Sequence, residues 1–286
     1  MHETAKDEHG LTEGEFLAQY DPSRYGQLSV SVDTVVFGVD CRLSTENFRK
    51  LDEQKLTVLL IKRDTHPFLG CWSLPGGFVG PSEPLDDTAR RVLRSKTGLD
   101  EVYLEQIYTF GAPKRDPRMR IISCAYLALI DRSKYTLSDV ENGLQNAWFE
   151  IEFGSNAEAV ILKSGDESFE IPVITRTVRN GRIETQSHKV ANGSALAFDH
   201  ATIILEALLR LRGKIEYTDI VFNLMPDHFT ISDLQQIYEI ILGHALITPQ
   251  FRREIAPKLK GTDKYVRNKG HRPSQLFGYI GSDVRT

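Results

Sequence analysis

The chain has 286 residues, enough for two domains, and its 41% hydrophobic and 26% charged residues are typical of a soluble globular protein. No apolar run reaches the length of a membrane span, and the first residues, MHETAKDEHG, are charged, so we expect no membrane insertion and a cytoplasmic location. The three cysteines, Cys41, Cys71 and Cys124, are too few and too far apart to indicate a disulfide framework or a zinc site.

Charge is unevenly distributed along the chain. The whole sequence carries a net charge of −4, whereas residues 246–286 contain nine Lys or Arg against Glu254, Asp263 and Asp283. An acidic body with a basic C-terminal part is typical of a protein with a nucleic-acid-binding appendage, although a solvated basic surface would give the same count.

Hydrophobic periodicity predicts a sheet and one helix in the first half of the chain. Strand patterns, alternating or continuously apolar, occupy residues 28–39, 56–62, 103–110 and 120–130. Apolar residues at three- and four-residue spacing predict a helix over residues 85–96.

Residues 150–193 predict a hairpin-rich insertion in this first domain. A short strand or sheet edge is expected at residues 148–151, and alternating segments that predict strands lie at 159–163, 168–179 and 182–190. Asn180-Gly181 is a hairpin turn signal between the last two. A helix is then predicted over residues 196–211, with Gly213 ending it.

The last part of the chain has the element order of a winged helix. Thr230 is the expected N-cap of a helix over residues 231–242, and Gly243 should end that helix. A second helix is predicted over residues 248–259, which Pro257 should kink or end, and two short strands follow. Helix, turn, helix and hairpin in this order predict a winged helix-turn-helix.

The most informative stretch is residues 70–99, GCWSLPGGFVGPSEPLDDTARRVLRSKTGL. It keeps five positions of a fixed frame: Gly77, Glu83, Arg91, Gly98 and Leu99. This frame resembles the Nudix box, the catalytic motif of diphosphate hydrolases. The Gly76-Gly77 pair suits a tight turn and a close approach of the backbone to a ligand.

The three remaining acidic positions of that box hold Val92, Ser95 and Lys96. On the predicted helix these positions share one face, where three glutamates would form a cradle for magnesium. Val, Ser and Lys offer one neutral oxygen and one positive charge, which repels a cation and could instead contact phosphate. The sequence therefore predicts that the fold survives while diphosphate hydrolysis does not.

Several segments together resemble the Nudix-related transcriptional regulators, bacterial repressors of NAD-metabolism and related genes. They are PFLGCWSLPGGFV, YTFGAPKRDPRMRIISCAYLAL, LAFDHATIILEALLRLRGKIEYTD, FTISDLQQIYEIILG, FRREI and HRPSQLFGY, and they cover roughly residues 28–130 and 195–280. The resemblance implies an α/β fold, with a Nudix α/β/α sandwich (residues 1–213) followed by a winged helix-turn-helix domain (residues 214–286). It also implies that the Nudix domain senses ADP-ribose or a related nucleotide or sugar metabolite, which lowers DNA affinity.

The resemblance also nominates the residues that line the effector pocket. Carried over to this sequence, they are Arg63, Phe68, Gly76, Gly77, Glu83, Arg91, Lys96, Phe110, Arg115 and Arg118. Arg63 and Arg118 could pair phosphates through bidentate guanidinium forks. No catalytic residue, metal ligand or cofactor is expected.

Structural roles remain an alternative for some of these residues. Arg91 would then only orient Glu83, and Arg115 would form a local surface ion pair with Asp116. His200 is expected to be a packed or interface histidine rather than a ligand.

The winged helix implies double-stranded DNA as the second partner. Its nominated DNA-binding residues are Gln250, Arg252, Arg253, Lys258, Lys264, Arg267, Lys269, His271 and Arg272, on the second helix and the wing. Helix-turn-helix repressors usually bind near-palindromic sites as dimers, so a homodimer is expected.

A divergent hydrolase is the alternative function. In that case Glu83, with Asp86 or Asp87, would recruit magnesium to hydrolyse ADP-ribose-like nucleoside diphosphates. Those aspartates lie one to two turns before the usual ligand positions, which disfavours the alternative. An RNA-binding module is disfavoured because the C-terminal part has a helix-turn-helix order and no sheet of stacking aromatics.

Overall fold

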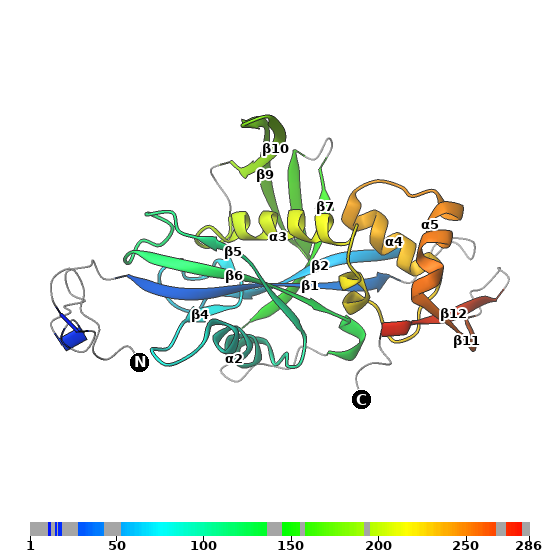
Figure 1. Cartoon of the computed structure of the whole chain (residues 1–286), viewed down its shortest axis with the longest axis horizontal. Helices are drawn as coiled ribbons and strands as arrows, with labels where there is room; N and C mark the ends of the chain where they lie inside the picture. The colour runs from blue at the N-terminus through cyan, green and yellow to red at the C-terminus, as the bar shows by residue number, and fades with distance from the viewer. Residues whose placement is uncertain are drawn as a thin grey trace.

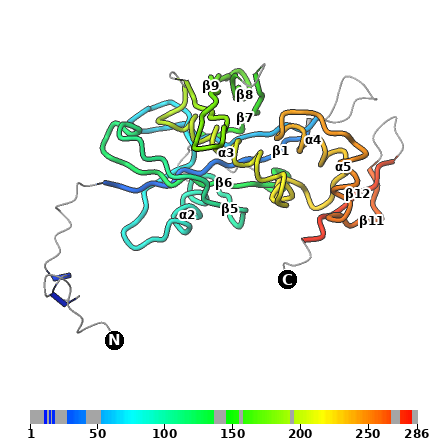
Figure 2. Tube along the Cα trace, turned by 45° about the horizontal axis from the view of Figure 1, so that its top comes forward, coloured from blue at the N-terminus to red at the C-terminus, as the bar shows by residue number. Residues whose placement is uncertain are grey.

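The structure is a computed structural model that describes residues 11–12, 15, 17–18, 28–42, 53–135, 145–154, 158–191, 195–266 and 273–281. A long twisted sheet forms the centre of the molecule, with α3 (His200–Lys214) on one face and α2 (Leu85–Thr97) on the other (Figure 1). The C-terminal helices and a small hairpin gather at one end of this sheet, an arrangement that Figure 2 shows from a second direction. The predicted α/β/α sandwich followed by a winged helix is confirmed.

The strand order of the central sheet is β10-β9-β8-β7-β2-β1-β6-β5, with β3 paired to β2 and β4 paired to β1. The strands are β1 (Ser29–Arg42), β2 (Glu53–Lys62), β3 (Trp72–Ser73), β4 (Gly76–Phe78), β5 (Tyr103–Phe110), β6 (Ile121–Ile130), β7 (Asn146–Phe153), β8 (Ala159–Ser164), β9 (Glu167–Asn180) and β10 (Ile183–Val190). β1 runs parallel to β6 and antiparallel to β2, so it lies at the centre of the sheet.

The alternation along β1 explains why the sheet is covered on both sides. Val35 and Phe37 are buried with the residues of α3, whereas Val32 and Val36 are buried with those of α2. Successive residues of a strand point to opposite faces, so an apolar run such as this needs a helix on each face.

The segment predicted to be an insertion is part of the central sheet. β7 pairs with β2 through Thr57 and Glu150, and β8, β9 and β10 extend the sheet from there. The turn between β9 and β10 is also displaced by one residue from the prediction. Asn180 pairs with Ile183, so the turn residues are Gly181, with a φ of 63°, and Arg182.

Helix α3 begins and ends later than the sequence predicts. It cannot start at residue 196 because Phe198 has a left-handed φ of 53°, which interrupts helical geometry. Gly213 lies inside the last turn, and the helix continues to Lys214. Helix α2 follows its prediction closely and ends at Gly98, with a φ of 72°.

The C-terminal elements confirm the predicted winged helix order. They are η4 (Ile220–Leu224), α4 (Ile231–Leu242), α5 (Thr248–Ile255), η5 (Ala256–Lys258), β11 (Leu259–Val266) and β12 (Ser274–Tyr279). Thr230 caps α4 in a reciprocal capping box with Asp233, and Gly243 ends it with a φ of 80°. Helix α5 stops before Pro257, as the missing proline N–H requires. Within the described residues, no helix is long and apolar enough to cross a membrane.

Candidate effector pocket and DNA interface

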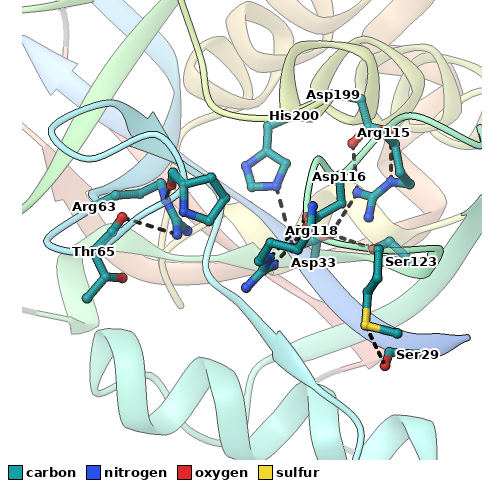
Figure 3. A network of polar contacts seen from close by, with 12 residues as sticks. Ser29, Asp33, Arg63, Thr65, Arg115, Asp116, Arg118, Ser123, Asp199 and His200 are labelled. Carbon is teal, nitrogen blue, oxygen red and sulfur yellow. Dashed lines mark hydrogen bonds and ion pairs between the residues drawn. The ribbon is translucent and has the colours of Figure 1, made fainter.

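A pocket of about 190 Å³ opens between three segments: the glycine loop (residues 74–80, which include β4), the start of α3 and the loop after β5. Its lining residues are Ser31, Asp33, Arg63, Leu74, Gly76, Gly77, Phe78, Arg115, Asp116, Arg118, Ile121, Phe198 and His200. The pocket therefore brings together segments that lie far apart in the sequence, and its polar side chains converge in Figure 3.

Arg115, on the loop after β5, is held by two carboxylates, Asp199 just before α3 and Asp33 on β1. Its Nε and Nη2 donate to Asp199 at 2.9 and 2.7 Å, and Nη2 also lies 3.3 Å from Oδ2 of Asp33. The Arg115 side chain is only 3% exposed, so this charge is available to a ligand only at a cost in broken ion pairs. The alternative role of Arg115, a surface ion pair with Asp116, is not what the structure has: Arg115 is buried and pairs with Asp33 and Asp199, and Asp116 pairs with Arg118.

The side chain of Asp33 explains why position 76 must be a glycine. A Cβ on Gly76 would lie 2.1 Å from Oδ1 of Asp33 and 3.0 Å from the carbonyl oxygen of Val32. Asp33 also accepts a hydrogen bond from Ser123 on the parallel strand β6. Gly76 is therefore required so that a buried carboxylate on β1 fits beneath the glycine loop.

Arg63 and Arg118 both lie close to the Phe198 ring. Their guanidinium carbons are 4.9 and 5.8 Å from the ring centroid, and Phe68 packs edge-on against the same ring at 4.8 Å. Arg118 is 43% exposed and makes a bidentate pair with Asp116, with Nε and Nη2 at 3.0 and 2.7 Å. Burial and the neighbouring Arg118 lower the pKa of Arg63. Two cations thus lie beside one aromatic ring, Arg118 exposed and Arg63 partly buried.

His200 is buried at the inner end of the pocket. Its Nδ1 accepts a hydrogen bond of 2.8 Å from the Leu74 N–H, so the ring proton of the neutral form is on Nε2, which lies 3.6 Å from Oδ1 of Asp33. Burial lowers the pKa of His200. The side chain is packed, as expected, and it also ties the start of α3 to the glycine loop.

The nominated effector residues separate into four groups. Arg63, Gly76, Gly77, Arg115 and Arg118 line the pocket. Phe68 lies beside it through Phe198, whereas Phe110 is in the hydrophobic core. The members on the α2 side, Glu83, Arg91 and Lys96, are outside the pocket lining.

Glu83 and Arg91 form a brace between the glycine loop and α2. Arg91 donates from Nε and Nη2 to the two carboxylate oxygens of Glu83 at 2.7 and 2.8 Å, and Nη2 also donates to the carbonyl oxygen of Phe78. Thr88 Oγ1 and the Gly80 N–H donate to the same carboxylate. Hydrogen bonds from Arg91 and Thr88 lower the pKa of Glu83 to about 2.

The residues at the magnesium positions of the box do not fit magnesium. Val92 is 2% exposed and packs toward Gly77, and the Ser95 hydroxyl donates to the Val92 carbonyl oxygen at 3.2 Å. Lys96 adds a positive charge on the same face. In the part of the chain that the structure describes, no three His, Cys, Asp or Glu side chains form a cluster able to hold a metal ion.

Asp86 and Asp87, the candidate magnesium ligands of the hydrolase alternative, have separate environments. Asp86 accepts a hydrogen bond of 2.5 Å from the Tyr126 hydroxyl. Burial, together with this hydrogen bond, raises the pKa of the Tyr126 phenol above its ordinary value. Asp87 is exposed in the first turn of α2.

Asp33, Asp116 and Phe198 line the pocket, and Asp199 holds its Arg115, but these four residues were not identified as site residues from the sequence. A carboxylate within the apolar run of β1 is the signal that could have revealed Asp33, because a buried charge needs a partner. Phe198 and Asp199 lack such a signal, since only the turn before α3 brings them to the pocket.

The exposed face of α5 carries three of the nominated DNA-binding residues. Gln250, Arg252 and Arg253 are exposed, whereas Phe251 and Ile255 are buried against α4 and the hairpin. Gln250 donates to Glu254 at 2.9 Å, and neither arginine forms an ion pair with any residue in the described ranges. Among the described residues, α5 therefore has two exposed arginines without a carboxylate partner.

The other nominated basic residues differ in their availability. Lys258 is paired with Asp219 at 2.6 Å, and Lys264 contacts His228 at 2.9 Å on the exposed side of β11. Four nominated residues fall outside the described residues: Arg267, Lys269, His271 and Arg272.

Two protein-family models match this chain, one in each of its two parts. Residues 47–159 match a family model described as NUDIX domain, and residues 221–279 match one described as NrtR DNA-binding winged helix domain. A relative from Acinetobacter baylyi, the ADPR responsive transcriptional repressor NtrR, is 33% identical over 276 residues, which cover 95% of this chain and 90% of the relative. An ADP-ribose pyrophosphatase of Methanocaldococcus jannaschii is 37% identical over 75 residues, 26% of this chain and 44% of that enzyme.

Solved structures agree with these matches. Shewanella oneidensis NrtR in complex with a 27mer DNA has a TM-score of 0.60 and 27% identity, covering 87% of this chain and 93% of that chain. A MutT/nudix family protein from Enterococcus faecalis has a TM-score of 0.68 over 94% of both chains, but at 24% identity the likeness shows the fold alone. With a relative of 33% identity along nearly its whole length, the chain belongs to the Nudix-related transcriptional regulators, in which a Nudix domain is joined to an NrtR-type winged helix.

Proposed function

We propose that this protein is a DNA-binding transcriptional repressor whose Nudix domain senses ADP-ribose or a close relative without hydrolysing it. The observation that carries the proposal is the combination, in one chain, of a winged helix with two exposed arginines on α5 and a Nudix box without its magnesium ligands. The full-length similarity to an ADPR responsive repressor gives the effector class. We divide the chain into a sensing domain, residues 1–213, and a DNA-binding domain, residues 214–286.

Arg63 and Arg118 are the residues we assign to the effector's phosphates. Both border the pocket, and Arg118 already holds a carboxylate, Asp116, in the bidentate geometry that a phosphate would adopt. A diphosphate would compete with Asp116 for that guanidinium. Arg115, locked between Asp33 and Asp199, would position the pocket rather than contact the ligand.

Glu83 and Arg91 have a structural part in this proposal. Their mutual bidentate pair fixes the glycine loop over α2, which shapes the pocket without entering it. Lys96, at the end of α2, carries the wrong charge for a metal ligand, so we assign it no catalytic role.

The DNA-binding part would work as a homodimer in the cytoplasm, where bacterial chromosomal DNA lies. Helix α5 would enter the major groove, with Gln250, Arg252 and Arg253 nearest bases or phosphates. Lys264 on β11 would meet the backbone beside it.

A gel shift with DNA from upstream of this protein's own gene tests the repressor assignment. At near-physiological salt we expect a specific shift that adding ADP-ribose abolishes. Retention of the shift at saturating ADP-ribose would reject ADP-ribose as the effector. The absence of a specific shift with any DNA fragment of the organism's genome would reject the DNA-binding function.

The hydrolase alternative is tested by AMP release. With ADP-ribose and magnesium the wild-type chain should release no AMP above the uncatalysed rate. The variant Val92→Glu with Ser95→Glu and Lys96→Glu restores the three carboxylates, and gain of magnesium-dependent AMP release there would indicate that their loss separates sensor from enzyme. Magnesium-dependent turnover by the wild type would overturn the assignment.

A further inference from the structure

Helix α3 runs from the effector pocket to the winged helix. Its 15 residues span roughly 22 Å at the rise of an α-helix. One end meets the pocket at Asp199 and His200, and the other end reaches the C-terminus of α4 through Arg212. No other helix in the described ranges is hydrogen-bonded both to a residue of the pocket and to a helix of the winged helix domain.

The pocket end of α3 is held by groups that an anionic ligand would disturb. Asp199 occupies the N-cap position, yet its side chain makes no cap and binds Arg115 instead, at 2.7 and 2.9 Å. The Leu74 N–H donates to His200, and the Ala197 N–H donates to the Trp72 carbonyl oxygen at 2.9 Å. Arg63 and Arg118 contact the ring of Phe198, the residue directly before Asp199, at 4.9 and 5.8 Å. A phosphate that draws these two guanidiniums toward itself would weaken their contact with Phe198, so the start of α3 is sensitive to occupancy of the pocket.

The far end of α3 grips α4 through one side chain. Arg212 Nε donates to the Ile241 carbonyl oxygen at 2.8 Å, in the last turn of α4, and its guanidinium lies 5.0 Å from the Phe153 ring centroid. The last carbonyls of a helix have no partner within the helix and carry partial negative charge, so a cation there is stabilising. Within the described residues Arg212 has no carboxylate partner, and burial lowers its pKa. The α4 terminus is therefore its principal polar contact.

Helices α4 and α5 are tied to each other beyond that point. Glu239 accepts hydrogen bonds from the Leu246 N–H at 2.8 Å and from Gln235 Nε2 at 2.9 Å, and Gln235 also donates to Thr248 Oγ1 at 3.1 Å. Tyr238 packs edge-on against Phe251 at 5.2 Å. A displacement of the α4 terminus would consequently carry α5 and its exposed arginines with it.

We infer that α3 couples the effector pocket to the DNA-reading helix, and that Arg212 is the positioning residue that passes a movement of α3 to α4 and α5. The inference rests on the proposed function, because it needs an effector in the pocket and DNA on α5. By thermodynamic linkage, the factor by which ADP-ribose changes DNA affinity equals the factor by which DNA changes ADP-ribose affinity. Loss of the coupling residue should reduce both factors together.

The test compares two arginines of the same helix in the full-length protein. Arg212→Gln removes the contact with α4, whereas Arg210→Gln removes a contact of the same kind, a 3.1 Å hydrogen bond to the Ile107 carbonyl oxygen on β5. In the wild type and in Arg210→Gln, ADP-ribose should weaken DNA binding by the usual range of about 5–150-fold. In Arg212→Gln the change should fall below about two-fold while the Kd for ADP-ribose alone stays within about three-fold of wild type, a near-complete loss of coupling on the same scale. Arg212→Lys, which keeps a cation at the α4 terminus, should restore part of the response.

The outcomes separate the inference from the function on which it rests. If the wild type responds to ADP-ribose and Arg212→Gln responds equally, the coupling role is wrong and the repressor assignment stands. If the wild type itself does not respond, the effector assignment fails, and the coupling inference fails with it.

Hydrogen exchange of the wild type supplies a readout that needs no variant and serves if Arg212→Gln loses DNA binding altogether. Adding ADP-ribose should change amide exchange from residue 239 to residue 251, at the end of α4 and the start of α5. Unchanged exchange there, under conditions in which ADP-ribose releases DNA, would overturn the inference.

Discussion

Gly77 and Val92 fit together only because Gly77 has no side chain: a Cβ there would lie 2.8 Å from Cγ2 of Val92. The contact joins the glycine loop to the buried face of α2 at a position where the Nudix box has a magnesium ligand. At this position Val92 makes a packing contact where a glutamate of the Nudix box would bind metal. Packing against Val92 therefore helps to hold the glycine loop in place.

The first prediction concerns this contact. Gly77→Ala should lower the free energy of unfolding by roughly 1–3 kcal/mol, because it overpacks the space that Val92 occupies. The double variant Gly77→Ala, Val92→Ala should lose less than the sum of the two single variants, since the smaller side chain at position 92 makes room for the new methyl group. Urea unfolding of the four proteins measures the cycle, and strictly additive losses would show that the two residues do not interact.

The second prediction concerns acid stability. The pKa of Glu83 is about 2 in the folded protein, below its ordinary value of 4.5, so the unfolded chain binds a proton more readily. Its stabilising contribution is therefore fully present above pH 4.5 and is lost as the pH falls toward 2. Glu83→Gln should be less stable than wild type at pH 7, and this difference should shrink below pH 4.5. A difference that stays constant from pH 7 to pH 3 would contradict the contribution of this carboxylate.

The third prediction concerns the buried charges of the pocket. Arg115→Met should destabilise the protein by roughly 3–5 kcal/mol, because Asp33 and Asp199 would be left without their cation. Adding Asp33→Asn and Asp199→Asn should recover part of that loss, since the uncompensated charges are then removed. Midpoints of chemical denaturation report both effects. A loss no larger than that of an exposed salt bridge would mean that Arg115 is not the structural centre of the pocket.

The fourth prediction separates free from paired cations in the winged helix. Arg252→Ala and Arg253→Ala should each reduce the salt dependence of DNA binding by roughly 0.9 in the slope of log K against log salt concentration, as expected for one lost phosphate contact. Lys258→Ala should change the slope less, because Lys258 is already paired with Asp219 at 2.6 Å. Equal slopes for Lys258→Ala and Arg252→Ala would contradict this distinction.

The winged helix could be predicted because its signals are local. Thr230 with Asp233 three residues later, and Gly243 after an apolar periodic run, fix both ends of α4 within a few residues of chain. Pro257 fixes the end of α5 in the same way. The Nudix box could also be recognised, since all its positions lie within one loop and one helix.

The pocket could be predicted only in part because its charges meet through the sheet. Arg115 meets Asp33 and Asp199 only after β1 pairs with β6 and α3 packs across the sheet, and none of those pairings is visible in a short stretch of sequence. The position in the sheet of the strands predicted over residues 150–193 could not be predicted for the same reason. Their alternating pattern indicates strands, but the pairing of β7 with β2 is a property of the whole sheet.

The most direct test of the central claim, sensing without turnover, is one titration followed in two ways. A fluorescent operator fragment, bound by the full-length protein at near-physiological salt with magnesium, is titrated with ADP-ribose while its anisotropy is recorded, and AMP is then assayed in the same sample. The account predicts that the anisotropy falls to that of free DNA and that no AMP accumulates above the uncatalysed control. Anisotropy that stays high at saturating ADP-ribose, or release that requires AMP formation, would contradict it.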